Sequence, residues 1–268
     1  MTFLELEHKT VLIAGLANRK SIAWFVHQAL TEAGARCVHV VKTAEMAAAA
    51  MKLVGTSPVY VCDVSQQAQI ERLASELEAQ NVTLNGLVHS LAFANYSEGV
   101  RPFHETVRAD FLEAVDISCF SLVALSRALL PRFAPRASIV TLSISHTQLA
   151  AESYGYMAPV KAALDATVVF LAKSLSSHGD LRVNSVKAGP LKTSSSAGIP
   201  GYLDNYLFAE MATLRHRALT TPEVANAVLF LLSDRSSGIN AQGLVVDAGL
   251  SVNFFDRNIV ERATRPTP

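Results

Sequence analysis

The chain has 268 residues, half of them hydrophobic, and its 23 basic residues are balanced by 23 acidic ones. This length is enough to bury the core of one α/β domain, and we expect a single domain over residues 1–268. Zero formal charge and the lack of a basic run argue against nucleic acid as a partner. No apolar stretch approaches the ~18 residues of a membrane span and the N-terminus lacks a secretory pattern, so we expect a cytoplasmic protein without a membrane partner.

Short apolar runs rich in β-branched residues alternate along the chain with stretches of helical period. This alternation predicts a Rossmann-type, doubly wound parallel sheet of about seven strands in a three-layer α/β/α arrangement. The predicted strands cover residues 10–14, 36–41, 58–62, 85–90, 137–143, 182–187 and 243–247. The predicted helices cover residues 21–33, 44–54, 66–80, 106–131, 157–177 and 221–233, with a shorter helix at 202–214.

Two connections, 91–104 and 189–220, are longer than the loops of a compact domain usually are. Long loops of this kind usually bind something, and we expect 189–220 to bind substrate. Both follow predicted strands, so they can converge at one edge of the sheet. The tail 253–268 is either a loose end or an oligomer contact.

A nucleotide-binding turn follows the first predicted strand, in the segment Gly15-Leu-Ala-Asn-Arg-Lys-Ser21-Ile22-Ala23. Here a backbone turn opens a helix, whose free N–H groups and dipole favour a phosphate. The usual pattern has three glycines, whereas this segment has one. Ser21 can cap the helix and donate its hydroxyl to a phosphate.

Tyr154 and Lys161 are seven residues apart, a spacing that returns nearly to the same helix face. Tyr156 is five residues from Lys161 and is expected to point away. Pro159 suits the first turn of the following helix, so Tyr154 is expected just before that helix. The alternative is that both tyrosines are core residues and Lys161 is solvated, since short spacing motifs give many false matches.

Asp63 follows a predicted strand, where its carboxylate could accept from an adenine amino group or cap the helix near Gln66. The small residues at 90–94 allow a ribose or nicotinamide to approach the backbone, and His89 is expected in the core. The segment 183–193 ends a strand with Ala188-Gly189-Pro190 and can hold a carboxamide, or it is an ordinary turn.

The histidines show no metal-ligand spacing, so no metal is predicted. Ser145 and His146 lack the context of a nucleophile elbow, which argues against a hydrolase. Cys37, Cys62 and Cys119 are widely spaced, and we expect them to be reduced and structural.

Together these segments resemble the enoyl-acyl carrier protein reductases of bacterial fatty-acid synthesis, a divergent branch of the short-chain dehydrogenase/reductases. The resemblance runs along nearly the whole chain and includes the pair Tyr154-(x6)-Lys161. The ordinary superfamily pattern has its tyrosine four residues before the lysine, where this chain has Met157. Further matching segments are Cys62-Asp63-Val64, Val88-His89-Ser90-Leu91, Asp116-Ile117-Ser118, Arg182-Val183-Asn184 and Val246-Asp247.

The resemblance implies reduction of the double bond of a trans-2-enoyl thioester, with Tyr154 and Lys161 as catalytic residues. It also implies a homotetramer with contacts through 106–131 and 157–177, and a substrate linked to acyl carrier protein or coenzyme A. Tyr154 and Ala94 would touch the substrate. The residues implied in cofactor binding are Gly15, Ser21, Ile22, Lys42, Asp63, Val64, Ser90, Leu91, Lys161, Ala188, Gly189, Leu191 and Thr193.

Two positions depart from the family pattern. Ile144 stands where the family usually has a second tyrosine, so a hydrogen-bond donor is missing near the reacting atoms. Ala92 stands where a glycine is usual, which narrows the pocket floor. The loss at Ile144 leaves open a reductase of another activated alkene or carbonyl in a specialised pathway.

Cofactor choice depends on the end of the second predicted strand, Val40-Val41-Lys42-Thr43, which has no acidic residue for the adenosine 2′-hydroxyl. Lys42 could tolerate a 2′-phosphate. The family more often uses NADH, which we favour, and NADPH stays open. A non-catalytic dinucleotide sensor is the alternative from another class.

Overall fold

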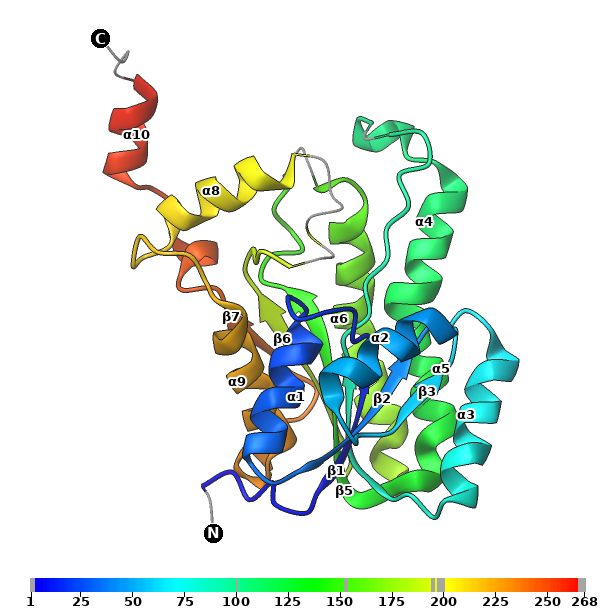
Figure 1. Ribbon diagram of the computed structural model, residues 1–268. Coiled ribbons are helices and arrows are strands. Elements are labelled where there is room, and N and C mark those ends of the chain that lie inside the picture. The colour runs from blue at the N-terminus through cyan, green and yellow to red at the C-terminus, as the bar shows by residue number, and fades with distance from the viewer. Residues whose placement is uncertain (1–2, 100, 152–153, 194–195, 197–200, 265–268) are drawn as a thin grey trace.

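The structure, a computed structural model, describes residues 3–99, 101–151, 154–193, 196 and 201–264. Parts of the predicted loop 189–220, including Gly198, and the last four residues of the tail lie outside the described residues. Figure 1 shows the strands in the middle of the molecule with helices around them.

Seven parallel strands form one sheet in the order β3-β2-β1-β4-β5-β6-β7, which confirms the predicted fold class. The strands are β1 (Thr10–Ala14), β2 (Arg36–Val41), β3 (Val59–Val61), β4 (Leu84–His89), β5 (Phe133–Ile144), β6 (Arg182–Ala188) and β7 (Gly243–Val246). The strand order reverses between β1 and β4. Ligands of doubly wound sheets bind at this switch point, outside the carboxyl ends of the strands.

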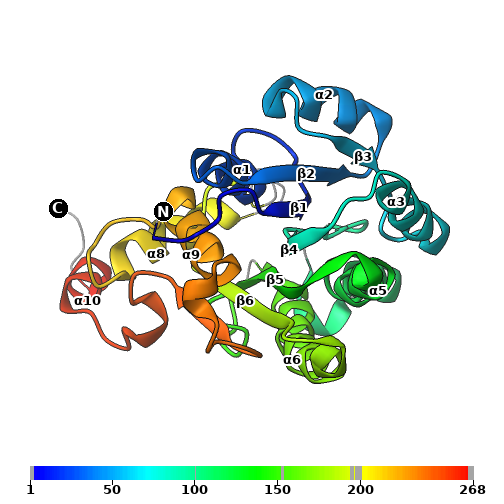
Figure 2. The same ribbon diagram turned by 90° about the horizontal axis from the view of Figure 1, so that it is seen from below.

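Helices cover both faces of the sheet (Figure 2). One face carries α1 (Ile22–Glu32), α2 (Ala44–Val54) and α9 (Thr221–Leu232), and the other carries α3 (Gln67–Ala79), α5 (Ser121–Leu129) and α6 (Met157–Leu175). The remaining described α-helices are α4 (Arg108–Val115), α8 (Tyr202–Ala212) and α10 (Arg257–Thr264).

The sheet separates two apolar cores. Leu12 and Ala14 pack with α3, α5 and α6, whereas their neighbours Val11 and Ile13 pack with α1 and α9. Successive strand residues point to opposite faces, so a strand covered on both faces must be apolar throughout. This explains why the strands appear in the sequence as continuous apolar runs.

The predicted helix 106–131 is interrupted in the structure. α4 leads into a π-helical turn, Asp116–Phe120, then α5, and the segment ends in a 3₁₀ turn, Leu130–Arg132. Contrary to our expectation, this stretch, Arg108–Arg132, is long and apolar enough to span a membrane by length and composition. Of its 18 most apolar consecutive residues, 56% are buried within the protein, and α5 contributes Leu122 and Leu125 to the core, as a core helix does.

Two further boundaries differ from the prediction. β5 begins at Phe133 rather than at 137, because Phe133 pairs with Leu84 before the register shifts at Gly86. The tail predicted at 253–268 contains α10, which has no buried residue and lies away from the sheet in Figure 1.

Candidate active site

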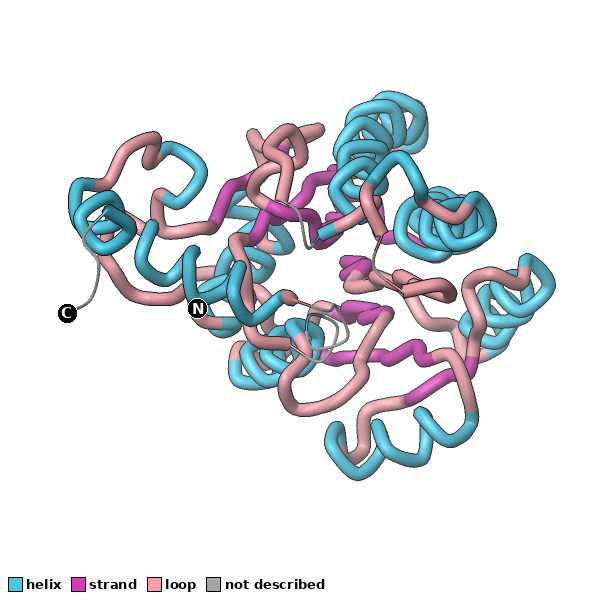
Figure 3. The backbone as a smooth tube through the Cα atoms, turned by 90° about the horizontal axis from the view of Figure 1, so that it is seen from above, coloured by secondary structure: helices cyan, strands magenta, loops and turns pink. Residues whose placement is uncertain are grey.

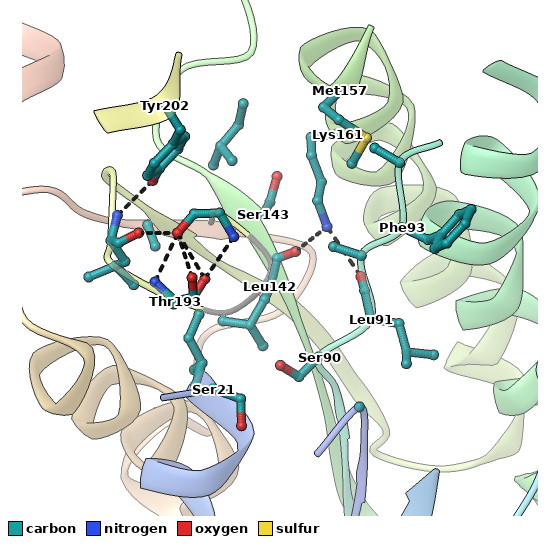
Figure 4. Close-up of a pocket in the computed structure, with 18 of the residues that line it drawn as sticks. Ser21, Ser90, Leu91, Phe93, Leu142, Ser143, Met157, Lys161, Thr193 and Tyr202 are labelled. Atoms are coloured by element: carbon teal, nitrogen blue, oxygen red, sulfur yellow. Dashed lines mark hydrogen bonds between the residues drawn. The ribbon is translucent and has the colours of Figure 1, made fainter. Parts of the chain in front are cut away.

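The carboxyl ends of β1, β4, β5 and β6 border one pocket of about 300 Å³. Figure 3 looks down on this edge of the sheet, and Figure 4 shows the pocket between β4, β5, α6 and the chain after β6. The pocket is lined by most of the predicted site residues: Gly15, Ser21, Ile22, Ser90, Leu91, Ala94, Tyr154, Lys161, Ala188, Gly189, Leu191 and Thr193.

Gly15 lets β1 and β4 approach each other at the pocket floor. Its φ is +104°, and a Cβ there would lie 2.1 Å from the carbonyl oxygen of Ser90. The Gly15 N–H donates to Val40 O and the Ser90 N–H donates to Ala14 O, so both residues stay fixed to the sheet. A residue with a side chain would be strained at this turn.

Ser21 caps α1 as predicted. Its hydroxyl accepts a hydrogen bond from the backbone N–H of Trp24 and donates one to Asn18 O at 2.6 Å. Ser21 lies at the pocket, so the N-terminus of α1 is directed at the space that a phosphate would take. Ile22, the first residue of α1, also borders the pocket.

Lys161 is a buried cation on α6. It is 4% exposed, and its Nζ donates to the carbonyl oxygens of Leu142 at 2.8 Å and Leu91 at 3.4 Å (Figure 4). Burial lowers the pKa of Lys161 to about 8, against the opposing effect of the Asp165 carboxylate. The alternative of a solvated Lys161 is therefore wrong, and the ammonium is held in place between β4 and β5.

Tyr154 lies just before α6, as predicted, and borders the pocket. Burial raises its pKa, so the phenol stays protonated and can donate a hydrogen bond. Its hydroxyl forms no hydrogen bond within the described part of the chain. Tyr156 instead points away, donates to Asn95 O and packs against Tyr96 and Phe111.

The chain after β6 forms the opposite wall. A Cβ on Gly189 would lie 2.9 Å from Cβ of Asp247, so this glycine allows the close packing of β6 against the chain that follows β7. Leu191 N donates to the hydroxyl of Tyr202, and the hydroxyl of Ser196 donates to Leu191 O at 2.8 Å (Figure 4). The bond to Tyr202, the first residue of α8, connects α8 to the pocket wall.

Three predicted cofactor residues lie apart from this pocket, near the ends of β2 and β3. Lys42 and Asp63 form an ion pair of 3.3 Å, and Val64 packs on the core. Asp63 does not cap α3, because its carboxylate accepts from the N–H and hydroxyl of Ser65. The N-cap of α3 is Gln66, without a side-chain cap, since Asp63 is used in the preceding turn.

Hydrogen bonds connect the loop after β4 to the π-helical turn Asp116–Phe120. The buried hydroxyl of Ser118 accepts from Phe93 N at 2.9 Å, and lies 3.2 Å from Phe93 O. The buried Asp110 accepts from the N–H and hydroxyl of Ser97. Ala94 and Ala92 border the pocket on this loop, and Ile144 borders it from β5.

Several buried residues outside the pocket have partners or burial that fit a structural role. His89 is fully buried between the hydroxyls of Thr141 and Ser121, each 2.8 Å from a ring nitrogen, as predicted for a core residue. Cys37, Cys62 and Cys119 are buried free thiols. Among the described residues, no cluster of three or more His, Cys, Asp or Glu side chains could hold a metal ion.

The pocket fits a nicotinamide nucleotide. The Gly15 turn exposes backbone at a helix N-terminus. The hydroxyl of Ser143 is buried in the pocket wall and has no hydrogen-bond partner among the residues that the structure describes. Unpaired buried hydroxyls are costly, so Ser143 is available to a ligand. Tyr96, Met157 and Tyr202 also border the pocket, although sequence reasoning missed them. Spacing gives no signal for them, because they come from different elements.

Fold and site together define a nucleotide-binding oxidoreductase of the short-chain dehydrogenase/reductase type. The chain belongs to the enoyl-acyl carrier protein reductase family: residues 15–251 match the family model described as "Enoyl-(Acyl carrier protein) reductase". It is 36% identical over 252 residues to the enoyl-[acyl-carrier-protein] reductase [NADH] FabI of Bacillus subtilis, covering 92% of this chain and 97% of that protein. It is 37% identical to the FabI of a Nostoc strain, covering 93% and 98%.

Solved structures agree with this assignment. The enoyl-[acyl-carrier-protein] reductase (NADH) of Aquifex aeolicus superposes with a TM-score of 0.89 at 32% identity, covering 94% of this chain and 99% of that one. The enzyme of Anaplasma phagocytophilum in complex with NAD gives 0.88 at 29% identity, covering 95% and 98%. A Bacillus cereus relative was solved with NADP⁺ and an indole naphthyridinone, with a TM-score of 0.84 at 31% identity, covering 94% and 98%.

Proposed function

We propose that this protein reduces the carbon-carbon double bond of a trans-2-enoyl thioester with NADH. The main support is the position of two side chains, Tyr154 with its protonated phenol and Lys161 with its buried ammonium. Both border the same pocket as the Gly15 turn. Family membership supports the same reaction, since the relatives are named as NADH-dependent enoyl reductases.

When bound, NADH would supply a hydride to the β-carbon of the thioester. Negative charge then develops on the thioester oxygen, and the Tyr154 hydroxyl donates a hydrogen bond to it. A proton from solvent would be taken up at the α-carbon to complete the reduction. The Lys161 ammonium, fixed by Leu142 O, holds the ribose hydroxyls and adds a positive charge beside the reacting atoms. Ala94, on the loop held by Ser118, contacts the acyl chain.

The other cofactor contacts follow the strand ends. Gly15, Ser21 and Ile22 bind the pyrophosphate at the N-terminus of α1. Ser90 and Leu91 border the adenosine side and its ribose, and Asp63, Val64 and Lys42 border the adenosine beyond it. Ala188, Gly189, Leu191 and Thr193 bind the carboxamide and a phosphate.

Tyr154→Phe tests the assignment. Loss of one hydrogen-bond donor to a developing oxyanion typically costs about 10²–10³ in kcat, and we expect a loss of that order. NADH affinity, measured by fluorescence titration, should stay near that of the parent. Tyr156→Phe is the matched control, because it removes a phenol hydroxyl outside the pocket.

A dinucleotide sensor would bind NADH, turn over no enoyl thioester and be unaffected by Tyr154→Phe. That outcome would refute the proposed reaction.

A second candidate is a reductase of another activated alkene or carbonyl. Ile144 favours it, because this aliphatic side chain borders the pocket and supplies no hydrogen-bond donor there. Enoyl and ketoacyl thioesters compared in one turnover assay, on the parent and on Ile144→Tyr, separate the two candidates. Preferred reduction of the ketoacyl thioester by the parent would favour the second.

We further propose a cytoplasmic homotetramer acting on a substrate linked to acyl carrier protein or coenzyme A. Exposed apolar side chains on the predicted contact helices support the assembly: Leu112, Phe120, Val169 and Phe170. Apolar patches on a helix surface favour contact with another subunit. Phe170→Glu, compared with the parent by light scattering, should reduce the molecular mass in solution. An unchanged mass would remove Phe170 from the interface.

A further inference from the structure

A smaller cavity of about 60 Å³ adjoins the main pocket at Tyr154. It shares Ile144, Tyr154 and Tyr202 with the main pocket, and adds Ser145 and His146, which follow β5 directly. We call it the side chamber, bounded by Ser145, His146, Leu149, Tyr154, Tyr202 and Asn205. Tyr154 therefore borders both cavities, and an acyl chain that reaches Tyr154 lies next to the side chamber.

Ser145 and His146 form a fixed polar pair. The Ser145 hydroxyl lies 2.7 Å from Nδ1 of His146, and the Ser145 backbone N–H donates to Ala188 O at the end of β6. When Ser145 donates to Nδ1, the proton of the neutral ring sits on Nε2, which becomes a donor. Nε2 has no hydrogen-bond partner among the residues that the structure describes.

The charges near Ser145 and His146 favour an uncharged ligand over an anionic one. Burial lowers the pKa of His146, so its ring is mainly neutral near pH 7, although the nearby Asp247 carboxylate opposes this effect. Asp247 is fixed by hydrogen bonds from the N–H groups of Gly249 and Ser251, both 2.9 Å. A neutral imidazole near a fixed carboxylate offers no cation to an anionic group.

The side chamber is otherwise largely apolar, so a hydrogen bond to Ser145 or His146 can distinguish one ligand from another. Leu149, Ala151, Ala158 and Pro190 are apolar, and Ile144 contributes only an aliphatic side chain. Besides Ser145 and His146, the polar side chains at the walls are Tyr154, Tyr202 and Asn205. A few polar groups in an apolar cavity fix the orientation of a ligand and discriminate against one that leaves them unpaired.

We propose that the side chamber binds an uncharged oxygen substituent, a hydroxyl or keto group, on the acyl chain of the enoyl thioester, with His146 and Ser145 as its hydrogen-bond partners. The inference rests on the proposed function, because that function places an acyl chain at Tyr154. It makes His146 and Ser145 determinants of substrate specificity and names oxygenated enoyl thioesters as the preferred substrate class.

The test compares kcat/KM for a series of enoyl thioesters with a hydroxyl or keto group at successive carbons beyond the double bond, each beside its unsubstituted counterpart. A hydrogen bond of ordinary strength gives a preference of about tenfold, and we expect at least that for one position of the substituent. In His146→Leu and in Ser145→Ala, the ratio of kcat/KM for the oxygenated thioester to kcat/KM for its unsubstituted counterpart should fall to near one. His146→Gln keeps a side-chain donor and should retain part of the preference.

Thr147→Val is the matched control, because Thr147 is the next residue and borders a different cavity. It should leave the ratio at the parent value. NADH titration of each variant confirms that the nucleotide site is still folded.

Turnover of the unsubstituted thioesters with no preference for any oxygenated one would overturn this inference and leave the proposed function standing. A preference that survives His146→Leu and Ser145→Ala would also overturn it. No turnover of either series would refute the proposed function itself.

Discussion

The carbonyl of Ser90 occupies the space that a side chain on Gly15 would need. β1 and β4 are neighbours in the sheet, and this contact lies where both strands end at the pocket. The positive φ of Gly15 adds a second restriction, since residues with a Cβ rarely adopt it. Close backbone approach and turn geometry thus both require glycine here.

Gly15→Ala should therefore destabilise the protein. Backbone strain of this kind costs about 1–3 kcal/mol, and the steric overlap with Ser90 O adds to it. We expect a lower free energy of unfolding in urea and weaker NADH binding. Gly238→Ala is the control, because a Cβ there meets no atom within 4 Å and the backbone is not left-handed. Equal stability of the two variants would contradict the role of this contact.

Ser118→Ala should loosen the loop that carries Phe93 and Ala94. The substitution leaves the Phe93 N–H without its partner, and an unsatisfied group of this kind costs about 1–3 kcal/mol. We expect a higher KM for the thioester with a smaller change in the KM for NADH. Ser75→Ala, at an exposed position of α3, is the control. A KM for the thioester equal to that of the control would count against this role of Ser118.

NADH binding should weaken as the pH rises through about 8. The pKa of Lys161 is lowered to about 8, so the ammonium is present below that pH and lost above it, whereas an ordinary lysine keeps its proton to near 10.5. Fluorescence titrations of NADH on both sides of pH 8 measure the effect. In Lys161→Met the affinity should be lower and this step in the pH profile absent. A step that persists in the variant would assign the titration to another group.

Cofactor choice should depend on Lys42. Its side chain is half exposed and pairs with Asp63, so it can also reach a 2′-phosphate at the end of β2. Exposed ion pairs contribute up to about 1 kcal/mol, and we expect Lys42→Gln to lower the kcat/KM ratio of NADPH to NADH by about threefold. Lys52→Gln, on the exposed last turn of α2, should leave the ratio unchanged. A ratio unaltered by Lys42→Gln would exclude phosphate recognition by this residue.

The sequence alone was sufficient to predict the sheet, because seven apolar runs separated by helical periods allow few other arrangements. It also predicted the position of Tyr154 and Lys161 at the start of α6, since helical spacing is local. The interruption of the helix at Asp116–Phe120 was missed. A π-helical turn does not change the spacing of hydrophobic residues enough to be recognised in the sequence. Here it brings Ser118 within hydrogen-bond distance of Phe93 N.

Local patterns thus determined the strands, the cap at Ser21 and the spacing of Tyr154 and Lys161, because each depends on residues close in the chain. Only the tertiary structure showed that Lys161 is buried between Leu142 and Leu91, and that Ser145 and His146 share a cavity with Tyr202. Burial and proximity between distant segments arise when strands and helices pack together. The pKa of Lys161 and the shape of the side chamber follow from that packing rather than from any single stretch of sequence.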